Sequence, residues 1–122
     1  ARRLEVQARG LDALLVALKA GLAAEWANTL VIVATEFGRT AGGNGTGGTD
    51  HGTASALFLL GGNLSGGGNV QADWPGLTAS ALYEGRDLRP TASLETEVSS
   101  AIAAHYALEP RAVKRALYPD LV

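Results

Sequence analysis

Glycine is crowded into one stretch of this sequence. Of the 16 glycines in 122 residues, 12 lie between Gly38 and Gly68. Ordering glycine costs more backbone entropy than ordering any other residue, so such a stretch becomes fixed only if another interaction compensates. Two apolar runs, 29–34 and 56–60, flank the first part of the stretch. We therefore expect a glycine-rich loop carried between two strands.

The loop 41–52 admits two interpretations. Backbone amides that cradle an anion, or a nearby metal site, would fix it in one conformation. Alternatively, glycine and small polar residues form a flexible surface linker. The loop contains no lysine and lacks the spacing of a dinucleotide fingerprint, so it matches neither common phosphate-binding motif.

Apolar spacing predicts the elements around this loop. The run 29–34 is β-branched and continuous, which is typical of a central strand buried on both faces of a parallel sheet. The run 56–60 predicts a second strand, and 70–72 a short third one. An amphipathic helix of about four turns precedes them, with its apolar stripe at Leu11, Leu14, Leu15, Leu18, Leu22 and Trp26.

Two further helices are predicted near the end of the chain. Ser93 is placed to cap the first, and Pro110 fits the first position of the second, which Pro119 stops. The order of elements indicates an α/β fold. The sequence predicts two clear strands, whereas a typical sheet has about five or six strands. We therefore expect residues 1–122 to form one segment, the C-terminal part of a larger domain with an incomplete sheet.

Composition excludes several classes of function. The net charge is −2, from 10 basic and 12 acidic residues, which gives no electrostatic attraction for nucleic acid or an anionic membrane. No apolar run approaches the ~18 residues of a membrane span. The absence of cysteine excludes disulfides and thiolate zinc sites.

Charged residues follow the first predicted strand directly. Functional groups in open α/β sheets gather beyond the carboxyl ends of strands, where Glu36 and Arg39 are found. Glu36 is a candidate metal ligand or base, and the forked donors of Arg39 suit a phosphate or sulfate. Alternatively, the two residues pair with each other or cap a helix.

Asp50 and His51 stand immediately before the second predicted strand. A carboxylate oxygen and an imidazole nitrogen together suit a divalent cation such as zinc, manganese, magnesium or calcium. With Glu36 the chain supplies three candidates where a site usually needs about four, so other ligands must come from elsewhere. The alternative is an ordinary turn pair. His105 is expected at a helix end, and Trp74 and Tyr83 are expected to pack beneath irregular loops rather than to line a substrate rim.

These motifs occur in an order that resembles a known family. The matching strings are 35–40 (TEFGRT), 44–45 (NG), 48–52 (GTDHG), 59–62 (LLGG), 73–77 (DWPGL) and 83–88 (YEGRDL). The chain resembles the C-terminal third of a large bacterial domain-of-unknown-function family that is grouped with the alkaline phosphatase and sulfatase superfamily.

The resemblance implies an α/β/α sandwich with one or two divalent metals at the strand ends, and a nucleophile from the N-terminal half. Asp50-His51-Gly52 is similar to a metal-ligand motif of the superfamily, and Glu36 stands where a strand-end ligand is expected. Better-known members place an Asp-His pair there, whereas this chain has Glu36-Phe37. Family members are exported, which implies a periplasmic location.

Two functions follow as expectations. The first is a metal-dependent hydrolase of phosphate or sulfate esters, with anionic small molecules or glycan esters as substrates. In it Asp50, His51 and Glu36 bind metal, Glu36 is the alternative base, and Arg39 stabilises charge on the transferred group. The second is a non-catalytic exported protein that binds an anionic glycan or a cell-envelope partner. We expect the segment to be inactive without the upstream part of the same protein.

Overall fold

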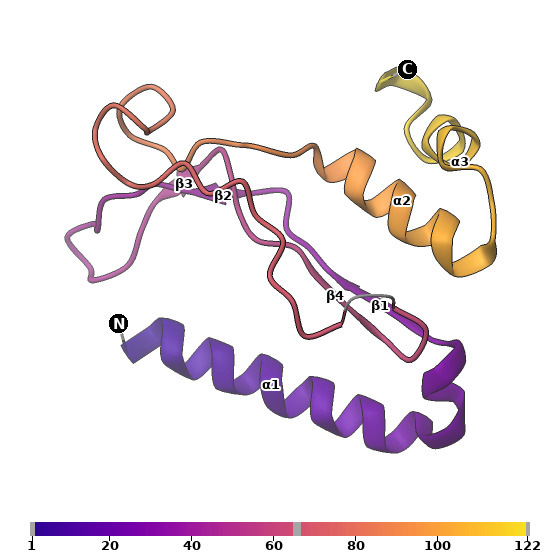
Figure 1. The fold of residues 1–122 in the computed structure, drawn as a ribbon. Coiled ribbons are helices and arrows are strands. Elements are labelled where there is room, and N and C mark those ends of the chain that lie inside the picture. The colour runs from indigo at the N-terminus through magenta and orange to yellow at the C-terminus, as the bar shows by residue number, and fades with distance from the viewer. Residues whose placement is uncertain (1, 65–66, 122) are drawn as a thin grey trace.

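The computed structural model describes residues 2–64 and 67–121 (Figure 1). Helices at both ends of the chain flank a group of short strands, which makes it a mixed α/β structure as predicted. Its elements are α1 (Arg2–Leu22), η1 (Ala23–Asn28), β1 (Leu30–Val33), β2 (Gly38–Arg39), β3 (His51–Gly52), β4 (Phe58–Gly61), α2 (Leu94–Tyr106), α3 (Pro110–Leu117) and η2 (Pro119–Leu121).

The strands form one interrupted antiparallel ribbon. In one half, β1 pairs with β4, with Leu30 opposite Gly61 and Val33 opposite Phe58. In the other half, β2 pairs with β3. Four residues (34–37) separate the halves on one arm and five (53–57) on the other, so the second arm carries one extra residue, as in a bulge.

The predicted parallel arrangement of the first strand is therefore wrong. The chain reverses direction in the loop between β2 and β3, which brings β4 back along β1 in the opposite direction. A short apolar run occurs in both kinds of sheet, so its composition did not decide between them. No strand forms at 70–72, a stretch that the structure describes as irregular.

The predicted amphipathic helix is confirmed as far as Leu22. It begins earlier than Leu11, and Trp26 lies beyond its end, in η1. Residues 2–10 are mostly good helix formers, and Glu5 and Arg9 form an i,i+4 ion pair of 2.7 Å. Along the stripe, Leu11, Leu15 and Leu22 are half-buried, whereas Leu14 is 62% exposed. Among the described elements, α1 comes close mainly to η1, which follows it directly in the chain.

Helices α2 and α3 form the best-packed part of the molecule. The Ser93 hydroxyl accepts a hydrogen bond from the Thr96 amide, and the Glu109 carboxylate accepts two from the first turn of α3, so both helices are capped. Ala107 ends α2 in the left-handed conformation. The buried apolar residues of the described chain are Ala101, Ala103 and Val113, all on these two helices.

The chain exposes more surface than a compact domain of its size. Its accessible surface is 8866 Å², whereas a folded monomer of 12.5 kDa exposes about 6,200 Å². In Figure 1 the ribbon lies between α1 on one side and the α2–α3 pair on the other. No helix among residues 2–64 and 67–121 is long and apolar enough to cross a membrane.

Candidate functional site

The predicted site residues gather at the β2–β3 end of the ribbon. Arg39 on β2 lies directly opposite His51 on β3. Gly38 lies opposite Gly52, and a side chain on either glycine would collide with backbone across the ribbon. A Cβ on Gly52, for example, would lie 2.5 Å from the carbonyl carbon of Arg39. These two glycines therefore allow the close pairing that sets Arg39 beside His51.

The glycine-rich loop 40–50 closes on itself. The Thr40 amide donates to the Asp50 carbonyl at 3.2 Å, and the Asp50 amide donates back to the Thr40 hydroxyl at 3.1 Å. Ala41 continues the ladder by donating to the carbonyl of Arg86 at 3.0 Å. The loop is thus held in the ribbon by hydrogen bonds within the chain and is not a flexible linker.

Asn44 organises the inside of this loop. Its Oδ1 accepts hydrogen bonds from the Thr46 amide, the Thr46 hydroxyl and the Gly48 amide, at 3.1, 2.9 and 3.0 Å. Its Nδ2 donates to Oδ1 of Asp50 at 2.9 Å. One half-buried amide side chain therefore holds both the loop backbone and a predicted ligand.

His51 is exposed and stacks on Phe37. The two rings are 4.4 Å apart between centroids and nearly parallel, at 4°. Phe37 therefore covers one face of the imidazole, and the ring nitrogens at its edge stay available. Phe37, which follows Glu36 in the segment after β1, thus contacts the histidine ligand candidate.

Arg39 and Glu36 do not form the ion pair considered as an alternative. Nη1 of Arg39 donates to the Thr49 carbonyl at 3.0 Å, and among residues 2–64 and 67–121 no salt bridge joins it to Glu36. Glu36 is exposed in the unpaired segment between β1 and β2. It does not join Asp50 and His51 in a common cluster.

The described residues do not complete a metal site. A carboxylate and an imidazole suit a divalent cation chemically, and Asn44 occupies only Oδ1 of Asp50. However, the described part of the chain contains no group of three or more His, Cys, Asp or Glu residues that could hold a metal. Any metal bound here needs ligands from outside these residues.

Asp87 is a second organising residue that the sequence reasoning did not single out. The residue is 4% exposed, and its carboxylate accepts hydrogen bonds from Arg86 Nε at 2.7 Å, Arg86 Nη2 at 3.1 Å and the Thr53 hydroxyl at 2.8 Å. The hydrogen bonds from Arg86, and then that from Thr53, lower the pKa of Asp87, and the same pair raises the pKa of Arg86. Because Thr53 follows β3, this carboxylate ties segment 83–88 to the ribbon.

A tight turn brings Asp87 to this position. Tyr83 and Asp87 exchange backbone hydrogen bonds, and Glu84 and Gly85 between them both have positive φ. Such φ values are typical of primed hairpin turns. The Leu88 amide then donates to the carbonyl of Arg39 at 3.3 Å. The Glu-Gly dipeptide was the available sequence signal for this turn.

The two aromatic side chains considered as part of a substrate rim, Trp74 and Tyr83, are both exposed. Trp74 is 62% exposed and Tyr83 is 38% exposed, so the expected packing of Trp74 beneath a loop is wrong.

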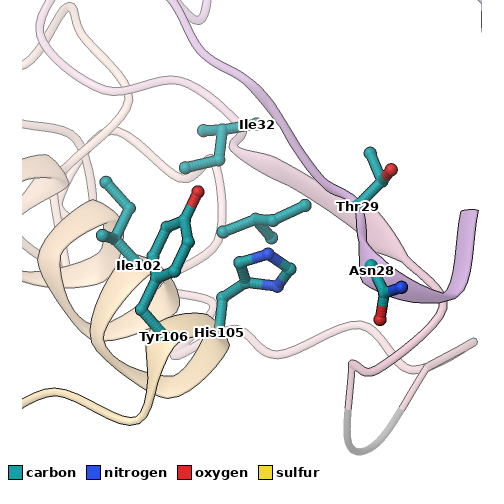
Figure 2. Close-up of a pocket in the computed structure, with 7 residues that line it drawn as sticks. Asn28, Thr29, Ile32, Ile102, His105 and Tyr106 are labelled. Carbon is teal, nitrogen blue, oxygen red and sulfur yellow. The ribbon is translucent and has the colours of Figure 1, made fainter. Parts of the chain in front are cut away.

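His105 lies in the last turn of α2, as predicted. With Ile102 and Tyr106 it faces Ile32 and Thr29 across an open pocket of about 440 Å³ (Figure 2). This pocket lies against β1, in the half of the ribbon away from His51.

Comparison with known proteins places the chain in one family. The family model described as "Protein of unknown function (DUF1501)" matches residues 1–101. The chain therefore belongs to the DUF1501 family. It has no significant match among curated proteins or solved structures.

Proposed function

We propose that this chain contributes part of the active site of a metal-dependent hydrolase of phosphate or sulfate esters, related to the alkaline phosphatase and sulfatase superfamily. The observation that carries the proposal is the ordered loop that holds Asp50 and His51, consecutive in the chain and both exposed, at the end of the ribbon. Order in so glycine-rich a segment requires specific interactions, and here they converge on Asn44, which in turn donates to Asp50.

Asp50 and His51 are the proposed ligands, and Glu36 stays outside the site. A bound divalent cation would act as a Lewis acid toward the ester oxygens. Arg39 uses one of its donors on the Thr49 carbonyl, and its exposed guanidinium has further donors for the oxygens of a transferred phosphoryl or sulfuryl group. The stacked Phe37 limits rotation of the His51 ring.

The remaining ligands and the nucleophile belong, in this proposal, to an upstream part of the same polypeptide. Two observations support this: α1 leaves apolar side chains such as Leu14 exposed, and the chain has a large excess of accessible surface. An upstream part that covers these surfaces would complete an α/β/α sandwich. On this basis the 122-residue chain alone binds metal weakly and does not turn over substrate. Export of the complete protein to the periplasm is proposed from the family resemblance alone.

Metal titration tests the proposal. We expect the chain to bind Zn²⁺ in calorimetry, and Asp50→Ala and His51→Ala each to weaken that binding at least about tenfold, because each removes one ligand. Asp73→Ala and His105→Ala are matched controls that leave the affinity unchanged. If the chain binds no Zn²⁺, or if the two ligand variants bind it as well as the original chain does, the assignment is wrong. Aryl phosphate and sulfate esters are the substrates for assaying the complete protein.

A second candidate function is binding of an anionic glycan without hydrolysis. The observation that favours it is Trp74, which is 62% exposed on an irregular loop and offers a flat apolar face to a sugar ring. In this case the complete protein binds sulfated or phosphorylated glycans, Trp74→Ala weakens that binding, and no ester is cleaved. Cleavage of the ester by the same preparation would reject this candidate.

A further inference from the structure

We infer that Asn44 is a positioning residue that fixes the Asp50 carboxylate and leaves its second oxygen for a ligand. The inference deepens the proposed function, because it rests on Asp50 as the group that binds metal. Its structural part concerns Asn44 and Asp50 alone, and it holds whether or not a metal binds.

Asn44 is held within the loop by hydrogen bonds of its side chain and of its backbone. Its Oδ1 accepts three, from two groups of Thr46 and from the Gly48 amide. The backbone amide of Asn44 also donates a hydrogen bond to the Gly48 carbonyl at 2.8 Å, and the Asn44 carbonyl accepts one from the Gly47 amide at 3.1 Å. Backbone and side chain are thereby both committed, so the direction in which Nδ2 points is fixed by the loop.

Nδ2 of Asn44 points at the carboxylate of Asp50. Nδ2 lies 2.9 Å from Oδ1 of Asp50, six residues along the chain. The backbone of Asp50 is held separately by two hydrogen bonds with Thr40. With backbone and one oxygen both fixed, χ1 of Asp50 has a single favourable rotamer. No other hydrogen bond to this carboxylate comes from the described residues, so Oδ2 remains available.

A carboxylate held in this way resembles the carboxylate ligands of metal sites. Carboxylate ligands are commonly held by a hydrogen bond to one of their oxygens, and loss of such a partner weakens metal binding about 10–100-fold. An amide is a suitable partner because it donates to the carboxylate without adding charge. The glycines of the loop, in turn, allow the backbone to wrap around Asn44.

Nuclear magnetic resonance of the metal-free chain tests the positioning. Hα–Hβ couplings of Asp50 report its χ1 rotamer, and we expect one rotamer in the original chain and averaged rotamers in Asn44→Ala. Asn44→Asp is the second variant, since it retains an acceptor for Thr46 and Gly48 but has no donor for Asp50. It should also show averaged Asp50 couplings, with the Gly48 amide still protected from exchange.

Thr46→Val is the matched control, because it removes one bond to Asn44 and none to Asp50. We expect it to keep the single Asp50 rotamer and the original Zn²⁺ affinity, whereas Asn44→Ala weakens Zn²⁺ binding about 10–100-fold. A single Asp50 rotamer in both Asn44 variants, or equal losses in Thr46→Val and Asn44→Ala, would overturn the inference. If the original chain holds the rotamer but binds no Zn²⁺, the positioning stands and the proposed metal function fails.

Discussion

The ribbon and the α2–α3 pair are held together by different interactions. The helical pair contains the buried apolar side chains Ala101, Ala103 and Val113. The β2–β3 end of the ribbon instead relies on close glycine contacts and on the hydrogen bonds of Asn44 and Asp87. The helical pair therefore supplies packing stability, while the ribbon supplies a precise arrangement of polar groups. Substitutions in the two regions should therefore change different measurements.

The largest expected effect is that of Gly52→Ala. The new Cβ meets backbone atoms of Arg39 and Thr40, which have no side-chain rotation to relieve the collision. We expect the β2–β3 pairing to lose about 3 kcal/mol, the upper end of the cost of overpacking. Hydrogen exchange at the Arg39 and Thr40 amides measures this loss.

Gly45→Ala is the control for Gly52→Ala, because nothing lies within 4 Å of a Cβ at Gly45. It should leave exchange at Arg39 and Thr40 unchanged. If exchange at the Arg39 and Thr40 amides is unchanged or slower in Gly52→Ala, the two strands are not paired as closely as the structure has them. The α2 amides should keep their protection in both variants.

Val113→Ala is expected to have the next largest effect, in the other region. It removes two methyl groups from a side chain that is 7% exposed between α2 and α3, at a cost of about 2 kcal/mol. Urea unfolding followed by helical circular dichroism measures the change. Val70→Ala, at a valine that is 93% exposed, is the matched control and should change stability little. Equal effects of the two substitutions would contradict the packing of α2 on α3.

The smallest expected effect is the part of the acid dependence of the ribbon that Asp87 carries. The pKa of Asp87 lies below its usual value of 3.8, because Arg86 and Thr53 donate hydrogen bonds to its charged form. The folded ribbon therefore binds fewer protons than the unfolded one. Asp87 stabilises it above that usual pKa, and this contribution is lost as the pH falls through the lowered pKa.

Amide exchange at Tyr83 and Asp87, followed between about pH 6 and about pH 2, measures this dependence. Asp87→Asn should remove it there. The pKa values of Glu95 and Glu109 are also lowered, by hydrogen bonds at the helix starts, so acid weakens α2–α3 with the same sign. An unchanged acid dependence at Tyr83 in Asp87→Asn would show that Asp87 does not hold this segment.

Local signals in the sequence predicted the helices well. Ser93 and Pro110 mark helix starts by chemistry that acts within one turn, and both helices begin where predicted. The two main strands were also predicted, but their pairing was not. Strand direction depends on how the loop 40–50 turns the chain, and this follows from hydrogen bonds between residues that are not yet close in the unfolded chain.

The candidate site was predicted in part for the same reason. The pattern identified Asp50, His51 and Arg39, which the structure brings to one end of the ribbon. It did not identify Asn44 or Asp87, because their roles depend on the folded paths of loop and turn. An asparagine followed by glycines is, however, a known signal for a side chain that bonds its own backbone two residues on, and Asn44 does so to Thr46.

The excess surface of the folded chain has a calorimetric consequence. A 12.5 kDa chain exposes about 18,000 Å² when unfolded. Unfolding of this structure, from 8866 Å², therefore exposes about a quarter less new surface than unfolding of a compact domain of the same mass. Both the heat-capacity change and the denaturant m-value scale with that newly exposed surface. The chain on its own should unfold over a broad range of temperature and denaturant, and binding of a partner that covers its surfaces should sharpen both transitions.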